Sequence, residues 1–129
     1  MKQYSILIVD DDKNIVDIYS IKFKSFGCEV NTATNIADAY VLIKNGLVPN
    51  AMLLDIIMPG GNGIELLNKI RKENLLSNTA VIILSNLDQR ADMDSEFLKK
   101  IDGYFIKASV TPKELVENIL DILSKKNPQ

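Results

Sequence analysis

The sequence MLLDIIMPGG, residues 52–61, joins an apolar run to one carboxylate, Asp55, and then to a turn. Short apolar runs that end at turn residues such as Pro59 and Gly60 are typical of buried strands, often in parallel sheets. Open α/β sheets bind their ligands at the carboxyl ends of their strands. From these residues alone, Asp55 is either a site residue or the first residue of a polar loop.

The composition indicates one domain and excludes several classes of function. The chain has 129 residues, of which 47% are hydrophobic, with a net charge of −2. This charge provides no basic surface for direct nucleic acid binding. No apolar run approaches the roughly 20 residues of a membrane span, and no secretory signal pattern is evident, so no membrane insertion is expected. The single cysteine, Cys28, fits a reducing compartment and predicts a cytoplasmic location.

Strands and helices are predicted to alternate along the chain. Apolar or alternating runs predict strands over residues 5–9, 29–33, 51–55, 80–84 and 103–106. Apolar residues at helical spacing predict helices over residues 13–26, 35–45, 63–72, 89–98 and 112–123. The segment 89–98 has the thinnest apolar stripe. A capping box, Thr111 to Glu114, marks the start of the last helix.

Five repeats of strand and helix predict an α/β fold, a doubly wound parallel sheet with helices on both faces. The most apolar runs, 5–9, 51–55 and 80–84, belong in the interior, and the alternating run 29–33 fits an edge. The strand order 2-1-3-4-5 satisfies both conditions and has its switch point between the first and third strands. The predicted domain covers residues 1–124, and residues 125–129 form a polar tail or the start of a linker.

The two strands at this switch point both end in carboxylates. Asp10, Asp11 and Asp12 follow the first strand, and Asp55 ends the third. Crowded carboxylates repel each other, and a hard divalent cation such as Mg2+ would offset this repulsion. The alternative is that the three consecutive acids only favour the start of the following helix, which is a sufficient explanation for Asp12.

Two further polar residues end neighbouring strands. Ser85 follows the fourth strand and Lys107 follows the fifth. Alone, each is commonly a structural residue. A metal, a lysine and a hydroxyl around one carboxylate would instead bind a phosphoryl group and neutralise its charge. Asp55 would then be the nucleophile, because carboxylates can form aspartyl phosphates.

These residues make the chain resemble a receiver domain of the bacterial two-component response regulators over nearly its whole length. The matching positions are Asp10-Asp11 after ILIV, Asp55 in LLDIIMPG, Ser85 after the fourth strand, and Lys107 after YFI. The resemblance implies a signalling switch, in which Asp55 accepts a phosphoryl group from a sensor histidine kinase or phosphotransfer protein. Such a domain is not an enzyme, although it assists its own phosphorylation and dephosphorylation.

The resemblance also implies roles for the surrounding residues. Asp11 and Asp55 would ligate Mg2+ directly, Asp10 would do so through water, and the backbone carbonyl of Ile57 would complete the protein ligands. Further along the chain, Ser85 and Lys107 would contact the phosphoryl oxygens. The two switch residues would be Ser85, which shifts toward the phosphoryl group, and Tyr104 at the aromatic switch position, which moves inward as Ser85 shifts. This predicts that the surface of helix four, strand five and helix five binds an unknown output protein.

The sequence departs from the family pattern in three places. Ala108 stands after Lys107, where the family usually has a proline after a cis peptide bond. A cis bond before another residue costs about 3 kcal/mol, so we expect the Lys107–Ala108 bond to be trans. Asn86 replaces a small residue after Ser85, and Ile57 is apolar where many members are polar. Both positions line the route by which water would reach the site, so they are expected to affect the dephosphorylation rate.

Other functions fit parts of the pattern. A phosphohydrolase with an Asp nucleophile, of the haloacid dehalogenase type, needs a second acid where this chain has Ile57. A flavodoxin-like nucleotide or flavin binder has only the weak glycine signal of residues 60–63 in its favour. A phosphorylation-independent interaction module on the same fold stays open. No DNA-binding element follows, so a stand-alone regulator is expected, although a domain cut from a longer chain would look the same.

Overall fold

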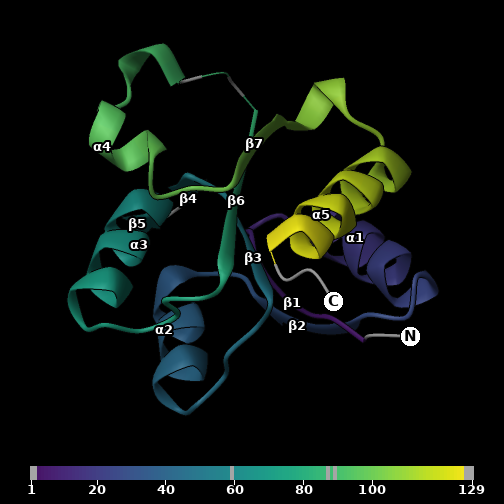
Figure 1. Ribbon diagram of the computed structural model, residues 1–129, viewed down its shortest axis with the longest axis horizontal. Helices are drawn as coiled ribbons and strands as arrows, with labels where there is room; N and C mark the ends of the chain where they lie inside the picture. The colour runs from purple at the N-terminus through teal and green to yellow at the C-terminus, as the bar shows by residue number, and fades with distance from the viewer. Residues whose placement is uncertain (1–2, 59, 87, 89, 127–129) are drawn as a thin grey trace.

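The computed structural model of the chain describes residues 3–58, 60–86, 88 and 90–126 (Figure 1). Pro59 and the last three residues of the predicted tail lie outside the described residues.

The main sheet has five parallel strands in the order β2-β1-β3-β6-β7, which confirms the predicted order. Its strands are β1 (Ser5–Val9), β2 (Glu29–Ala33), β3 (Ala51–Leu54), β6 (Ala80–Ser85) and β7 (Gly103–Ile106). Every residue of β3 and β6 is buried, whereas β2 is mostly exposed and forms an edge. Apolar content therefore predicted correctly which strands lie in the interior.

Helices cover both faces of this sheet. The helices are α1 (Lys13–Ser25), α2 (Ile36–Lys44), α3 (Gly63–Lys72), α4 (Ser95–Leu98) and α5 (Pro112–Lys126). One buried cluster joins the sheet to α1 and α5, and a second joins it to α2, α3 and α4. Figure 1 shows the same division, with α1 and α5 on one side and the other three helices on the opposite side.

Local sequence signals define several helix ends. The Asp12 carboxylate caps α1 by accepting from Asn14 N at 3.0 Å, and Gly27 ends that region with φ +85°. The predicted capping box is present. Thr111 N donates to Glu114 Oε1 at 2.9 Å, and Glu114 N donates to Thr111 Oγ1 at 3.1 Å.

The predicted helix over residues 89–98 is wrong in extent. The structure has a short 3-10 turn, Arg90–Asp92, and then the four-residue helix α4. Aspartates account for the interruption because their carboxylates bond nearby backbone N–H groups. Arg90 N donates to Asp88 Oδ1 at 3.1 Å, and Glu96 N donates to Asp94 Oδ1 at 2.8 Å.

Three smaller features also differ from expectation. β3 ends at Leu54, and the next residues form an unpredicted antiparallel hairpin of β4 (Ile57–Met58) and β5 (Gly61–Asn62), whose strands are too short to leave a pattern. Helix α5 continues to Lys126, which places the first two residues of the predicted tail in the helix. It includes an ion pair of 3.1 Å between Lys125 Nζ and Asp121 Oδ2. The domain end itself stays a prediction.

Candidate functional site

Asp55 is held at the carboxyl end of β3 by its backbone. Its N–H donates to Val9 O at 3.0 Å, and only 6% of the residue is exposed. Gly63, the first residue of α3, packs directly against it, since a Cβ atom there would lie 2.2 Å from the Asp55 carbonyl oxygen. The site therefore needs glycine at position 63, a requirement that the sequence pattern did not reveal.

Three carboxylates converge at this edge of the sheet. Asp10, Asp11 and Asp55 each offer an oxygen, and these oxygens lie within 4.8 Å of one another. Asp10 is buried and Asp11 is exposed. Hard oxygen donors of this kind are the ligands that Mg2+ prefers, so the donor set fits this cation. The Asp12 carboxylate is occupied by capping α1, as expected.

Lys107 brings a positive charge to the two buried carboxylates. Its Nζ lies 2.8 Å from Asp10 Oδ2 and 3.5 Å from Asp55 Oδ2. Apart from this contact with Lys107, Asp10 Oδ2 has no hydrogen-bond partner among the described residues. The Lys107–Ala108 bond is trans, as predicted, because no peptide bond among the described residues is cis.

The environment of Asp55 weakens its acidity. Burial is the largest effect and, together with the negative charge of Asp10, it raises the pKa of Asp55 to about 6 against the opposing charge of Lys107. Burial lowers the pKa of Lys107, but the hydrogen bond and charge of Asp10 and the charge of Asp55 outweigh it and raise the pKa above its ordinary value. At neutral pH the site therefore contains an ammonium and an Asp55 that is mainly ionised.

A cavity of about 450 Å³ opens beside these groups. Its walls include Asp11, Asp55, Lys107, Ile57, Asn86 and Ala108. The Ile57 residue is 62% exposed. All three positions that depart from the family pattern, Ile57, Asn86 and Ala108, thus line this cavity, which is large enough for a small ligand.

The two predicted switch residues lie on adjacent strands. Ser85 ends β6, is 2% exposed and pairs in register with Ile106, so the cavity is lined by Asn86 and not by Ser85. Tyr104 on β7 packs against the core cluster on the α2–α3–α4 side. The Arg90 guanidinium carbon lies 5.2 Å from the centre of the Tyr104 ring, a contact absent from the sequence-based expectations.

Known proteins are similar to this chain in both sequence and fold. The family model of the response regulator receiver domain matches residues 6–120. The response regulator SaeR of Staphylococcus aureus is 32% identical over 120 residues, which are 93% of this chain and 50% of that protein. The chain thus spans about half the length of the curated relatives it matches.

None of its described helices combines the length and the apolar content of a membrane crossing.

Solved structures agree with this result. The receiver domain of the Francisella response regulator 1452 is 33% identical, covers 96% of this chain and 99% of its own, and superposes with a TM-score of 0.81. A CheY-like receiver domain protein from Methanospirillum hungatei is 31% identical, with 97% of each chain covered and a TM-score of 0.83. TrrA from Thermotoga maritima, in complex with Mg2+-BeF, is 31% identical, with 95% and 99% covered and a TM-score of 0.77.

Three findings indicate the same family: the segment matched by the family model, the order of the strands in the sheet, and the similarity to solved receiver domains. The chain therefore belongs to the family of response regulator receiver domains, which act in phosphorylation-dependent signalling.

Proposed function

We propose that Asp55 is the phosphoacceptor of this receiver domain. The observation that carries the proposal is the convergence of Asp55 with Asp10, Asp11 and Lys107, of which Asp11, Asp55 and Lys107 line one cavity. An ionised Asp55 oxygen would attack the phosphorus of a phosphohistidine, so that an O–P bond forms as the N–P bond breaks. The electron pair of the broken bond returns to the imidazole of the donor, which then takes up a proton.

We assign the metal ligands from the same cluster. Asp11 and Asp55 would bind Mg2+ directly, Asp10 would act through water, and Ile57 would contribute its backbone carbonyl. The bound cation would neutralise charge on the phosphoryl oxygens. The TrrA complex with Mg2+-BeF supports this assignment, since it shares the fold and 31% of the sequence.

Lys107 and Ser85 complete the proposed phosphoryl contacts. Lys107 already faces Asp55 at 3.5 Å and would bind a phosphoryl oxygen on that carboxylate through its ammonium group. Ser85 ends the strand beside β3 and would contact another oxygen through its hydroxyl. The domain thereby assists its own phosphorylation and dephosphorylation without turning over a small substrate.

The phosphoryl donor would be a sensor histidine kinase or a phosphotransfer protein. The chain has no histidine, so the donor imidazole must belong to a partner. A surface for docking is available on α1, where Ile15 lines the Asp55 cavity and Ile18 and Ile21 are 49% and 69% exposed. We place this exchange in the cytoplasm, where the thiol of Cys28 would remain reduced.

The output would leave through α4, β7 and α5, around Tyr104. Phosphorylation would draw Ser85 toward the cavity, and the Tyr104 ring would move into the space that Ser85 leaves. An unknown output protein would bind the rearranged surface. Residues 1–124 are proposed to carry this function as one domain.

Treatment with acetyl phosphate and Mg2+ tests the phosphoacceptor. Mass spectrometry of the intact chain should show one added phosphoryl group, which Asp55→Asn should abolish. Modification that persists in this variant would overturn the assignment. Complete resistance of the wild-type chain would favour a phosphorylation-independent interaction module.

A metal titration tests the ligand assignment separately. Asp11→Asn should weaken Mg2+ binding at least tenfold, because even the loss of a residue that only supports a metal ligand typically costs about 10- to 100-fold in affinity. Asp12→Asn is the matched control because asparagine also caps helices and Asp12 is assigned to the cap of α1. Equal weakening in both variants would show that the ligand pair is wrong.

A further inference from the structure

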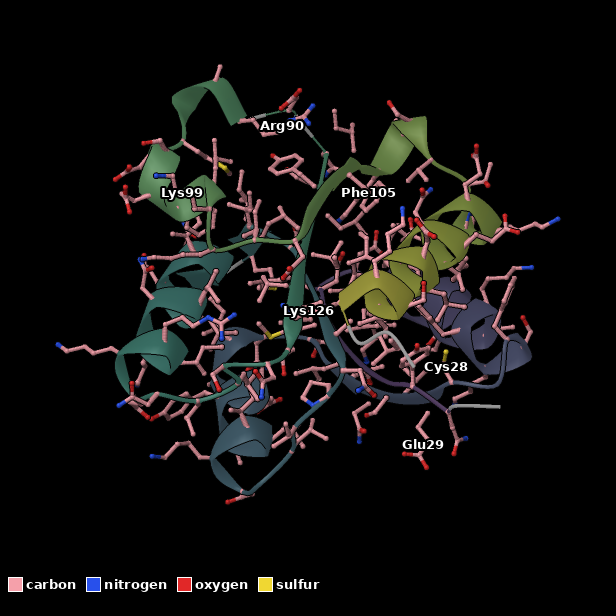
Figure 2. The ribbon with its side chains drawn as sticks, in the orientation of Figure 1. Cys28, Glu29, Arg90, Lys99, Phe105 and Lys126 are labelled. Carbon is pink, nitrogen blue, oxygen red and sulfur yellow. The ribbon has the colours of Figure 1, made fainter. Side chains whose placement is uncertain are left out.

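A second cavity lies at the amino ends of the sheet strands, opposite the Asp55 site, where α3, α4 and α5 end. It has a volume of about 630 Å³. Its charged lining consists of Arg71, Lys99, Lys100, Asp102 and Lys126. Figure 2 shows Lys99 at the end of α4 and Lys126 at the end of α5. Residues far apart in sequence thus bring their charges to one concave surface.

This lining is strongly positive on a chain that is slightly acidic overall. Four cationic side chains against one carboxylate leave a formal charge of +3, whereas the whole chain carries −2. The carboxylate is already engaged. Asp102 Oδ2 accepts from Val81 N at 2.8 Å, and Asp102 Oδ1 lies 3.4 Å from Lys126 Nζ. Lys99 Nζ also lies 3.5 Å from Glu96 Oε1 on the exposed side of α4. Among the described residues, Arg71 and Lys100 are therefore the two cations of this lining without an ion-pair partner.

Arg71 is held in position by the loop that follows α3. Its guanidinium donates to the carbonyl oxygen of Leu76, whose side chain is buried in the core. Leu76 has φ +56° and Asn74 has φ +60°, a conformation that costs roughly 1 kcal/mol or more for residues with a side chain. Because Leu76 is buried, its carbonyl oxygen has a fixed position, and the hydrogen bond to it orients the Arg71 guanidinium before a ligand binds.

Helix ends account for only part of this pattern. Cations near the C-terminus of a helix favour the dipole, which gives Arg71 and Lys126 a local reason to be there. Each helix end contributes only about half a negative charge. The four-residue helix α4 contributes less, so the cavity stays positive after these ends are included.

We propose that this cavity binds a small phosphate-bearing anion with two or more negative charges. Its volume lies within the range of small-ligand sites. A guanidinium fork matches phosphate oxygens, while the lysines supply charge that a singly charged anion would not balance. The site shares no residue with the Asp55 cavity, so it stands independently of the phosphoacceptor proposal.

Pyrophosphate is the probe for this proposal. An isotope-labelled chain is titrated in EDTA at constant ionic strength, and backbone amide signals are followed by NMR. Saturable shifts are expected over residues 71–77 and 99–102. Lys100→Gln and Arg71→Ala should each weaken binding about tenfold, the effect of losing one charged contact. Lys24→Gln removes a cation from the exposed side of α1 and should leave the affinity unchanged.

Several results would overturn the proposal. Shifts that grow linearly without saturation would indicate screening alone, and equal affinity in Lys100→Gln and Lys24→Gln would exclude a specific cavity. If Arg71→Ala fails to fold, Lys100→Gln still tests the proposal, because Lys100 is exposed and its substitution should leave the fold intact. Asp55→Asn should bind pyrophosphate as the wild type does, which separates this site from the phosphoacceptor.

Discussion

The two sides of the Asp55 site are stabilised in different ways. On the β1–β3 side, both strands lie in the core, Asp55 N bonds Val9 O, and Gly63 leaves no space beside the Asp55 carbonyl. On the β6–β7 side, the chain beyond Ser85 passes through a short turn and α4, and Phe97 is the only buried residue among those whose burial the structure describes there. The carboxylate that is proposed to accept the phosphoryl group thus lies on the rigid side, while the described part of the segment proposed to report it has few buried residues.

This difference suits a switch. Segments with few buried apolar contacts open at a low free-energy cost, whereas the fully buried strands open only with the whole domain. In the proposed mechanism, a small displacement at Ser85 would rearrange α4 and Tyr104 without disturbing the carboxylates. The following changes test this division, beginning with the largest expected effect.

Gly63→Ala should destabilise the rigid side most. The added Cβ would lie 2.2 Å from a backbone oxygen that cannot rotate away, so we expect a loss of about 3 kcal/mol in the free energy of unfolding. Urea denaturation measures this loss. Gly61→Ala is the control, because its nearest neighbour is the movable Ile36 Cδ1 at 2.6 Å. Similar losses in both variants would show that the Asp55 backbone is not tightly confined.

Asp55→Asn should stabilise the chain at pH 7 in EDTA. The folded pKa of Asp55, about 6, lies above its ordinary value of 3.8, so ionisation opposes folding as the pH rises through 6. The variant avoids this cost and should gain roughly 3 kcal/mol at pH 7. The gain should vanish below about pH 4, where the wild-type carboxyl is protonated in both states.

Urea denaturation at the two pH values measures this effect, with Asp17→Asn on the exposed side of α1 as the control. If Asp55→Asn has the wild-type stability at pH 7, the buried side does not oppose ionisation of Asp55.

Phosphoryl mimicry should alter the loosely packed side. Beryllium fluoride on a carboxylate oxygen has the shape and charge of a phosphoryl group. With Mg2+ it should slow hydrogen exchange roughly tenfold at amides in residues 86–106, because ordering that segment removes low-cost openings. Asp55→Asn should abolish the change. A response centred on residues 13–45 would contradict the proposed route.

Arg90→Ala should have the smallest effect. Arg90 is paired with Asp88 at 2.7 Å and contacts the Tyr104 ring, so it holds that ring in its present position. Losing a contact of about 0.5–1 kcal/mol should tighten beryllium fluoride binding two- to fivefold, because less energy is needed to move Tyr104. Fluorescence or calorimetric titration measures the affinity. Arg90→Lys keeps the cation and should shift it less, whereas weaker binding in Arg90→Ala would reverse the assigned role.

Much of the fold could be predicted from the sequence because its signals are local or periodic. Apolar runs identified the interior strands, alternation identified β2 as an edge, and Thr111 with Glu114 marked the start of α5. Since parallel strands end at the same edge, the chain order also predicted that Asp10, Asp55 and Lys107 would meet there.

Other features depend on contacts between distant segments. The approach of Gly63 to Asp55, the Arg90–Tyr104 contact and the hydrogen bond from Arg71 to Leu76 leave no period in the sequence. The short α4 likewise results from a competition for backbone N–H groups, because the carboxylates of Asp88 and Asp94 accept hydrogen bonds from N–H groups that a longer helix would use. Periodicity indicates which face of an element is buried, but the residue that an atom contacts across the fold depends on how the packed elements place their backbones.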